Sequence, residues 1–324
     1  MTREDAIRIG ISSCLLGEEV RFDGGHKRDR FLTDTLGRFV EWVPVCPEVE
    51  AGFGTPREPV RLREAMSLED GERRLRMVTV KTGVDLTGRM ERYARRRVEQ
   101  LRREDLCGYV LKKDSPSCGP QRVKVYNARG VPSRSGQGLF ASALRARFPF
   151  LPVEDEGRLT DARIRDAFIE RVFAYRRLRS LFASRWTVGG LVRFHTAHKL
   201  TLMAHSPAAY QQLGRLVARA KSVTRHELEA RYTEGFMRAL EVIVTPKRHT
   251  NVLQHMAGYF KAALDSVSRT ELAATIEDYR LGLVPLIVPI TLIRHHVRQH
   301  AVAYLAGQTY LEPHPKELML RNHV

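Results

Sequence analysis

The hydrophobic residues of the first 155 positions lie in short runs that are separated by helical patterns. Apolar runs predict strands at residues 7–12, 39–45, 108–111 and 150–153. The charged stretch 89–104 and residues 138–147 have the wider apolar spacing that is typical of helices. Strands that alternate with helices favour an α/β domain with a mainly parallel sheet.

The pattern changes near residue 160. Long helical patterns dominate from there onward, at residues 161–182, 188–204, 208–220 and 227–244. A chain of 324 residues is also long enough for two cores. We therefore predict an α/β domain at residues 1–157 and an all-α domain at residues 158–324.

Charge narrows the range of partners. Lys and Arg total 54 against 37 Asp and Glu, a net charge of +17. Residues 161–324 hold 24 basic and 13 acidic residues, so 24 − 13 = +11 lies in the helical half. A basic excess of this size favours a polyanionic partner such as nucleic acid, although a solvated basic surface is the simpler alternative.

The apolar pattern contains neither a membrane span nor a secretory signal, and this determines the compartment that we expect. No apolar run reaches the roughly 18 residues of a membrane span, and the first ten residues lack the apolar stretch of a secretory signal. We expect a cytoplasmic protein. In a reducing cytoplasm, disulfides are not the expected role of its four cysteines.

Three of these cysteines follow predicted strands. Cys14, Cys46 and Cys118 each come just after an apolar run, in a segment rich in Gly, Pro or Ser. Parallel sheets bind ligands beyond the carboxyl ends of their strands, so we expect the three thiols to converge. Cys107 opens a strand at the opposite end and is predicted to be a core residue. Three buried free thiols, or a zinc site with His26 as fourth ligand, are the alternatives.

The sequence around these cysteines resembles the thiouracil desulfidase family over roughly residues 5–155. Three blocks in compatible order carry the resemblance: Ser12-Ser-Cys14-Leu-Leu-Gly17 with Val20-Arg21-Phe22-Asp23-Gly24, Val45-Cys46-Pro-Glu48-Val-Glu-Ala-Gly52 with Pro56-Arg57, and Leu111-Lys112 with Ser115-Pro-Ser-Cys118-Gly119. The resemblance implies a 4Fe–4S cluster with three cysteine ligands, Cys14, Cys46 and Cys118. It also implies non-redox hydrolysis of a thiolated uracil. In that reaction the substrate sulfur binds the one iron of the cluster that has no protein ligand.

The same resemblance implies roles for several other side chains. Glu48 matches the catalytic carboxylate of the family, and Ser115 matches its catalytic serine. A role in forming a turn is the alternative for Ser115, because Ser-Pro often starts a turn. Arg21, Asp23 and Arg57 belong to the matching blocks and are predicted to contact substrate or to form ion pairs that shape the pocket. Gly136 and Gly138 open a helix and are candidates for presenting backbone N–H groups to substrate.

The helical half resembles the YbgA-like domain over about residues 185–320. The resemblance rests on Arg193-Phe-His195-Thr-Ala-His198-Lys199, Leu202-Met-Ala-His205-Ser206-Pro207, Lys247-Arg-His249-Thr-Asn251-Val-Leu-Gln-His255, Pro285-Leu-Ile-Val-Pro289 and the segment from Tyr304 to Pro315. Fusion of the two domains resembles the bacterial tRNA 4-thiouridine desulfidases, which implies thiolated tRNA as substrate.

In this interpretation the helical domain binds tRNA. The predicted contacts are His195, His198, Lys199, Lys247, Arg248 and His249. Metal binding by these histidines and ordinary core histidines are the alternatives. At the level of function, the alternatives are a desulfidase of free thiouracil with a structural helical domain, and a non-catalytic iron–sulfur protein that senses RNA. The sequence does not indicate an oligomeric state.

Overall fold

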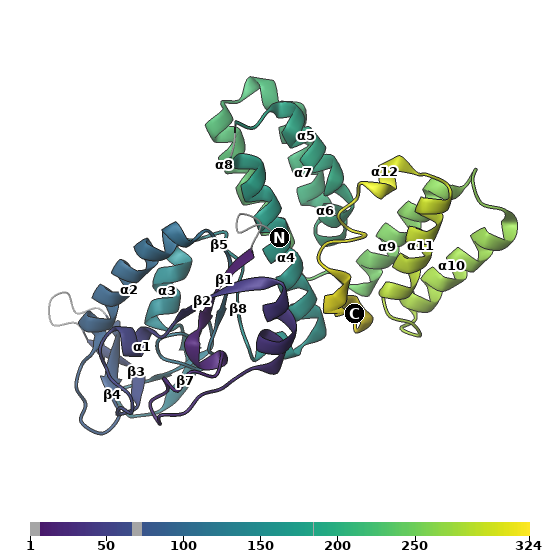
Figure 1. Ribbon diagram of the computed structural model, residues 1–324. Coiled ribbons are helices and arrows are strands. Elements are labelled where there is room, and N and C mark those ends of the chain that lie inside the picture. The colour runs from purple at the N-terminus through teal and green to yellow at the C-terminus, as the bar shows by residue number, and fades with distance from the viewer. Residues whose placement is uncertain (1–6, 67–72, 184) are drawn as a thin grey trace. The chain divides into compact units, whose positions relative to one another are not determined.

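The computed structural model describes residues 7–66, 73–183 and 185–324, and in it the chain divides into two compact units (Figure 1). The first unit is Met1–Thr160 and the second is Asp161–Val324. The boundary expected from the sequence lay at residues 157–158. Each unit has its own core, so each is described separately.

The main sheet of the first unit is fully parallel, with the strand order β2-β1-β5-β8. Its strands are β1 (Ile7–Ser12), β2 (Val40–Val45), β5 (Leu106–Leu111) and β8 (Val153–Asp155). Every residue of β5 is buried, as expected of a central strand covered on both faces. The predicted α/β fold with a mainly parallel sheet is confirmed, although the last strand begins at Val153 rather than at position 150.

Two helices of this unit pack on one another, α2 (Thr87–Leu101) and α3 (Leu139–Arg147) (Figure 1). The charged sequence of α2 still forms a stable helix because Met90, Tyr93 and Val98 lie on its buried stripe. A further short helix, α1 (Pro47–Glu50), follows β2 directly.

A second sheet was not predicted from the sequence. Its strand order is β4-β3-β6-β7, with β3 parallel to β6 and the outer pairs antiparallel. The strands are β3 (Val60–Met66), β4 (Arg73–Thr79), β6 (Val123–Tyr126) and β7 (Pro132–Gly136). The many arginines in β3 and β4 hide the period-2 apolar pattern, in which Leu62 and Met77 alone are fully buried among their described side chains.

The second unit is helical, which confirms the predicted all-α half. Its helices are α4 (Ala162–Phe182), α5 (Val188–Ala197), α6 (Lys199–His205), α7 (Pro207–Ala218), α8 (Arg225–Leu240), α9 (Pro246–Ala257), α10 (Ser266–Arg280), α11 (Ile287–Gln299) and α12 (Ala303–Ala306). Residues 188–204, predicted as one helix, are broken at His198, whose φ of −102° and ψ of 5° are not helical.

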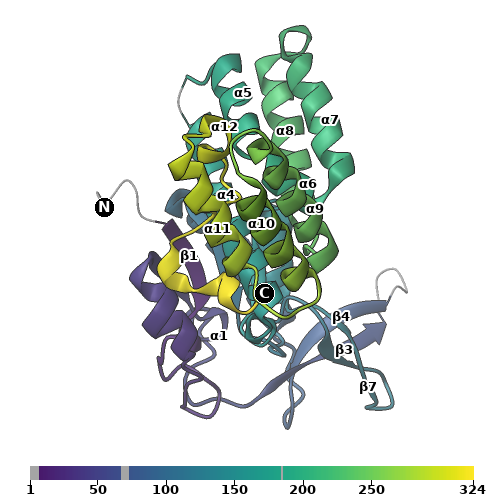
Figure 2. The same ribbon diagram turned by 90° about the vertical axis from the view of Figure 1, so that its right-hand side faces the viewer.

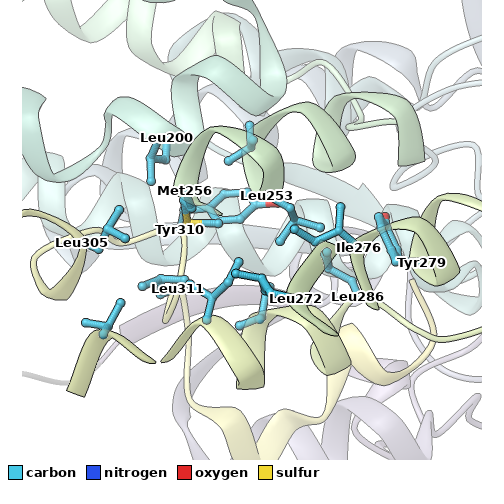
Figure 3. Close-up of a cluster of buried hydrophobic side chains, with 14 of the residues drawn as sticks. Leu200, Leu253, Met256, Leu272, Ile276, Tyr279, Leu286, Leu305, Tyr310 and Leu311 are labelled. Atoms are coloured by element: carbon cyan, nitrogen blue, oxygen red, sulfur yellow. The ribbon is translucent and has the colours of Figure 1, made fainter. Parts of the chain in front are cut away.

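Side chains at the helix starts explain several of these boundaries. Asp161 accepts hydrogen bonds from the N–H groups of Arg163 and Ile164, and Thr245 caps α9 in the same way through Arg248 N–H. A close-packed apolar cluster joins α6, α9, α10 and α11, with Leu253, Met256 and Tyr310 at its centre (Figure 3). Within the described ranges, no helix combines the length and apolar character that a membrane crossing requires.

Candidate active site

Three cysteines from three separate loops meet at one cavity of the first unit. Cys14 follows β1 in a short 3-10 turn, Cys46 follows β2 at the start of α1, and Cys118 lies in the loop after β5. Because β1, β2 and β5 are parallel neighbours, their carboxyl ends lie at the same edge of the sheet. The cavity has a volume of about 410 Å³, and all three cysteines line it. The expected convergence is therefore present.

The three thiols are held in a poorly solvated setting. Burial raises the pKa of Cys14 to about 11, against the opposing charge of Lys112. Burial also raises the pKa of Cys46 and, most strongly, that of Cys118, whose thiol is hydrogen-bonded to Ser12. Each thiol is also sensitive to the charge of the other cysteines or of Glu48. Free thiolates are therefore disfavoured here, and deprotonation requires a bound cation or electrophile.

Glu48 is fixed in this cavity by three hydrogen bonds from two side chains. Arg57 donates to Glu48 Oε2 from Nε at 2.9 Å and from Nη2 at 2.5 Å, and the side chains of both residues are largely buried. Ser117 Oγ donates to the other carboxylate oxygen, Oε1, at 2.8 Å. Arg57 itself is held by the carbonyl oxygens of Val20 and Gly54, each at 2.9 Å. Glu48 therefore has a single orientation, next to the thiols.

The sequence pointed to Ser115, but the contact with Glu48 is made by Ser117. Ser115 lines the cavity, and its Oγ accepts the N–H groups of Ser117 at 3.2 Å and Cys118 at 3.1 Å. Those bonds form a turn that presents Cys118. Ser117 is fully buried and was missed, because Ser-Pro-Ser-Cys offers two serines and only the loop conformation decides between them.

A second polar chain fixes Cys46. The Glu50 carboxylate accepts the Cys46 N–H at 3.0 Å, and its other oxygen accepts Tyr93 OH at 2.7 Å and pairs with Arg97 at 3.2 Å. Burial and the Glu50 carboxylate raise the pKa of Tyr93 well above its usual range, so its hydroxyl remains a donor. The cysteine loop is thus tied to α2.

Cations dominate the lining of the cavity. The described residues around it include seven Lys or Arg and two carboxylates, Glu48 and Asp114. The seven cations are Arg21, Lys27, Arg57, Arg61, Lys112, Lys113 and Lys124. Such a lining attracts anionic ligands and offsets part of the cost of deprotonating the buried thiols.

The other predicted substrate contacts divide into two groups. Arg21 lines the cavity and pairs with exposed Asp23, with 3.3 Å between Nε and Oδ1. Gly136 and Gly138 do not belong to its lining. A Cβ at Gly138 would lie 2.4 Å from Ser117 O, and its N–H donates to Gly119 O at 2.8 Å. Gly138 is therefore required for close packing behind the cysteine loop. Its N–H is already bonded to Gly119 O, which contradicts the prediction that it is presented to substrate.

A single-ion metal site is not formed by these side chains. Among the described residues, no three His, Cys, Asp or Glu side chains are grouped closely enough to hold one metal ion. His26, the fourth ligand in the alternative of a zinc site, is exposed, and its Nδ1 accepts the Arg28 N–H at 3.2 Å. Cys107 is buried in β5, away from the cavity lining, as predicted for a core residue.

Sequence comparison identifies this arrangement. A family profile described as 2-thiouracil desulfurase matches residues 9–156. The uncharacterized Bacillus subtilis protein YbbK is 30% identical over 141 residues, which cover 42% of this chain and 89% of YbbK. The chain belongs to the 2-thiouracil desulfurase family. This membership makes the first unit an enzyme domain of the desulfidase class, as predicted.

The desulfurase unit also has a relative among solved structures. The protein is titled a [4Fe-4S]-dependent thiouracil desulfidase, TudS, and shares 32% sequence identity. The match covers 48% of this chain and 93% of TudS, with a TM-score of 0.38.

The second unit contains a different family. Residues 199–315 match a family described as a protein of unknown function, DUF1722. The uncharacterized Escherichia coli protein YbgA is 36% identical over 163 residues, covering 49% of this chain and 95% of YbgA. This desulfurase-family chain thus combines two domains that occur as separate proteins, and the predicted resemblance of both halves is confirmed at this level.

The histidines of the DUF1722 unit do not lie where tRNA contacts require. His195, His198 and His249 are 4%, 2% and 3% exposed, respectively. His195 Nδ1 is hydrogen-bonded to Tyr232 OH at 3.0 Å, and His249 Nδ1 to Tyr310 OH at 2.7 Å. This placement contradicts their predicted role, because buried rings cannot reach phosphates or bases.

The three cationic contacts predicted in this unit differ in exposure. Lys247 is exposed, whereas Lys199 and Arg248 are half-buried. Arg248 Nη1 donates to His205 O at 2.7 Å, so part of its guanidinium is already used inside the unit. The surface therefore leaves Lys247 as the most accessible of these residues.

A buried polar network in the same unit joins Glu170 to His205 and Arg321. Glu170 lies 3.4 Å from His205 Nε2 and 3.8 Å from Arg321 Nη2. Burial alone would raise the pKa of Glu170, but its contacts with His205 and Arg321 lower it below its usual range. A fully buried carboxylate that stays charged requires such partners, so this network stabilises one packing of the helices.

Acid is expected to destabilise the DUF1722 unit. Burial lowers the pKa of His195 to about 4 and those of His198 and His249 to about 3. Below about pH 6.5 the unfolded chain binds protons that the folded chain excludes, so stability is complete above that pH and falls as pH decreases. Each histidine contributes at most about 1.4 kcal/mol per pH unit between its two pKa values.

Thermal melting of the full chain at pH 7.5 and pH 5.0, followed by circular dichroism, measures this effect. We expect a lower melting temperature at pH 5.0, and a smaller difference in a His249→Gln variant, whose amide can retain the bond to Tyr310. An equal pH difference in the variant and the parent chain would contradict the assignment of the effect to this histidine.

Proposed function

We propose that the protein is a tRNA 4-thiouridine desulfidase, which hydrolyses the C–S bond of the thiolated base and releases uridine and sulfide. One observation carries the proposal: three cysteines and a fixed Glu48 share one cation-lined cavity. The family places the reaction on thiolated uracil. The choice of tRNA rests on charge and on the added helical unit.

The cavity fits a 4Fe–4S cluster better than a single ion. Its donors are three soft thiols, with Lys112 and Arg57 close enough to lower the cost of deprotonating Cys14 and Cys46. A cluster binds each thiolate through a different iron and does not need all three around one point. Cys14, Cys46 and Cys118 would hold it. When bound, the cluster supplies an iron without a protein ligand, which acts as a Lewis acid toward sulfur.

Glu48 is positioned to manage protons in this hydrolysis. Its carboxylate accepts one proton from the water that adds to the ring carbon bearing sulfur and passes this proton to the sulfur. The carboxylate then takes the second proton from the new hydroxyl group as the C=O bond forms and the C–S bond breaks. This proton also goes to the departing sulfur, so that thiocarbonyl and water give carbonyl and hydrogen sulfide. Arg57 and Ser117 hold Glu48 in one orientation. Their hydrogen bonds remove the need to reorganise during the reaction.

RNA is favoured as the carrier of the thiolated base. The net charge of +17 and the cationic lining both attract a polyanion. A base paired or stacked in tRNA cannot enter a cavity of this kind, so it must first leave its stack. We infer that Lys247, with Lys199 and Arg248, contributes to phosphate binding in the DUF1722 unit.

Incubation of anaerobically reconstituted protein with 4-thiouridine-containing tRNA tests the proposal. We expect loss of the near-ultraviolet absorption of the thiobase together with release of sulfide. The family description favours free 2-thiouracil as the second candidate substrate. Turnover of free thiouracil with no loss of sulfur from thiolated tRNA would support that candidate and reject the tRNA proposal.

A further inference from the structure

The outer face of the second sheet is strongly basic. Leu62 and Met77, which pair across β3 and β4, are fully buried, so the alternate residues of these strands face outward. Among the described outward positions of β3, β4 and β6, none is acidic. Those positions are Arg61, Arg63, Ala65, Arg74, Arg76, Val78, Lys124 and Tyr126, here called the basic face. Figure 2 shows β3 and β4 side by side.

The strand register brings like charges together on this face. Arg63 lies directly opposite Arg76 in the β3–β4 pair. Like charges at directly opposed positions destabilise a sheet. Arg76 Nη1 lies 3.7 Å from Asp85 Oδ2, which is longer than a hydrogen bond. The Arg63–Arg76 pair is therefore costly for folding, and an external polyanion bound to these two side chains would lower that cost.

The basic face continues into the cysteine cavity. Arg61, Lys124 and Tyr126 belong both to this face and to the lining of the cavity. Arg63 lies directly opposite Tyr126 in the β3–β6 pair, and the Arg61 guanidinium lies 5.2 Å from the centre of the Tyr126 ring. Cations and an aromatic ring therefore form an unbroken path from the exposed sheet to the site.

We propose that the basic face binds the sugar–phosphate backbone of the RNA that flanks the thiolated nucleotide and directs that nucleotide into the cavity. The inference rests on the proposed function, and it places an RNA-binding surface on the desulfurase unit in addition to the helical one. Arginine side chains on a sheet bind phosphates by charge and paired hydrogen bonds, while Tyr126 offers a ring on which a base can stack. Contacts of this kind release counterions from RNA.

Charge reversal of Arg63 and Arg74 tests this surface. Both side chains are exposed, and neither lines the cavity. In the Arg63→Glu/Arg74→Glu chain, we expect affinity for thiolated tRNA to fall at least about tenfold at 0.1 M salt. The slope of log K against log salt should become shallower by about 0.7–0.9 for each lost phosphate contact. Turnover of free thiouracil should not change, which also shows that the variant is folded.

A matched control lies on α2. Arg95 and Arg96 are equally exposed cations of the same unit, and the Arg95→Glu/Arg96→Glu chain changes the net charge by the same amount. We expect its tRNA affinity to fall by less than about threefold. Long-range electrostatic attraction of tRNA contributes less to affinity than direct ion pairs with its phosphates. Equal losses in the two double variants would reject a specific surface.

The remaining outcomes separate this inference from the proposed function. If the parent chain desulfurates tRNA and Arg63→Glu/Arg74→Glu does so with unchanged affinity, the basic face has no role in binding and the inference fails while the function stands. If the parent chain neither binds nor desulfurates tRNA, the proposed function itself fails. Unchanged tRNA binding together with lost binding to anionic phospholipid vesicles would assign the face to a membrane surface instead.

Discussion

Serine at position 14, 46 or 118 is expected to abolish both iron binding and sulfide release. Cys14, Cys46 and Cys118 come from three loops that line one cavity, and serine is a hard, weakly acidic ligand that holds iron far less well than a thiolate. A cluster with only two thiolates would lack the support of the third loop. The measurement is iron and acid-labile sulfide per chain after anaerobic reconstitution, followed by turnover of a thiolated uracil.

Cys107→Ser is the matched control for these variants. Cys107 is more deeply buried than the other three, and it lies in β5 with its thiol 3.7 Å from Asp105 O. A serine hydroxyl can donate to the same carbonyl, so we expect normal iron content and normal turnover. Loss of iron from the Cys107 variant, or full iron in any of the other three, would overturn the ligand assignment.

Glu48→Gln is expected to lower kcat by about 10²–10⁴-fold, the usual contribution of a positioned acid or base. The amide keeps a hydrogen-bonding oxygen for Arg57 or Ser117 but cannot take up a proton from water. The Glu48→Gln substitution removes no thiol, so the iron content of the variant should equal that of the parent chain. The decisive comparison is kcat and iron content measured on the same preparation.

Ser117→Ala provides a graded comparison with this variant. Ser117 donates to Glu48 Oε1 at 2.8 Å, while Arg57 still holds the other oxygen. We expect a smaller fall in kcat, on the order of tenfold, and partial recovery in Ser117→Thr, which restores the hydroxyl. If Ser115→Ala has the larger effect of the two, the serine that touches substrate is Ser115, and Ser117 acts only in packing.

Local patterns were sufficient for the main elements of the fold. The apolar run at residues 7–12 and the Asp161 cap of α4 are signals carried by neighbouring residues, so they can be read without tertiary information. Even the meeting of Cys14, Cys46 and Cys118 follows from their positions after parallel strands. The second sheet escaped detection because its arginines mask the apolar alternation of β3 and β4.

The hydrogen-bond and ion-pair partners of the site residues could not be predicted from the sequence, because they depend on how the elements pack. Ser115 and Ser117 are two residues apart, and nothing in their spacing tells which one faces Glu48, since the loop conformation fixes the side-chain directions. In the helical half, His198 and His249 share a sequence context with exposed cations, yet both rings are buried. Their surroundings come from helices far apart in the chain.

The sequence by itself determined the strands of the parallel sheet, the change to a helical second half and the convergence of the three thiols. These features depend on local spacing and on the common direction of the strands in a parallel sheet. The tertiary structure alone decided which serine and which arginine hold Glu48, which histidines are interior, and that Arg63 faces Arg76 across two strands. Those features arise from contacts between distant residues, whose geometry is set only when the elements pack.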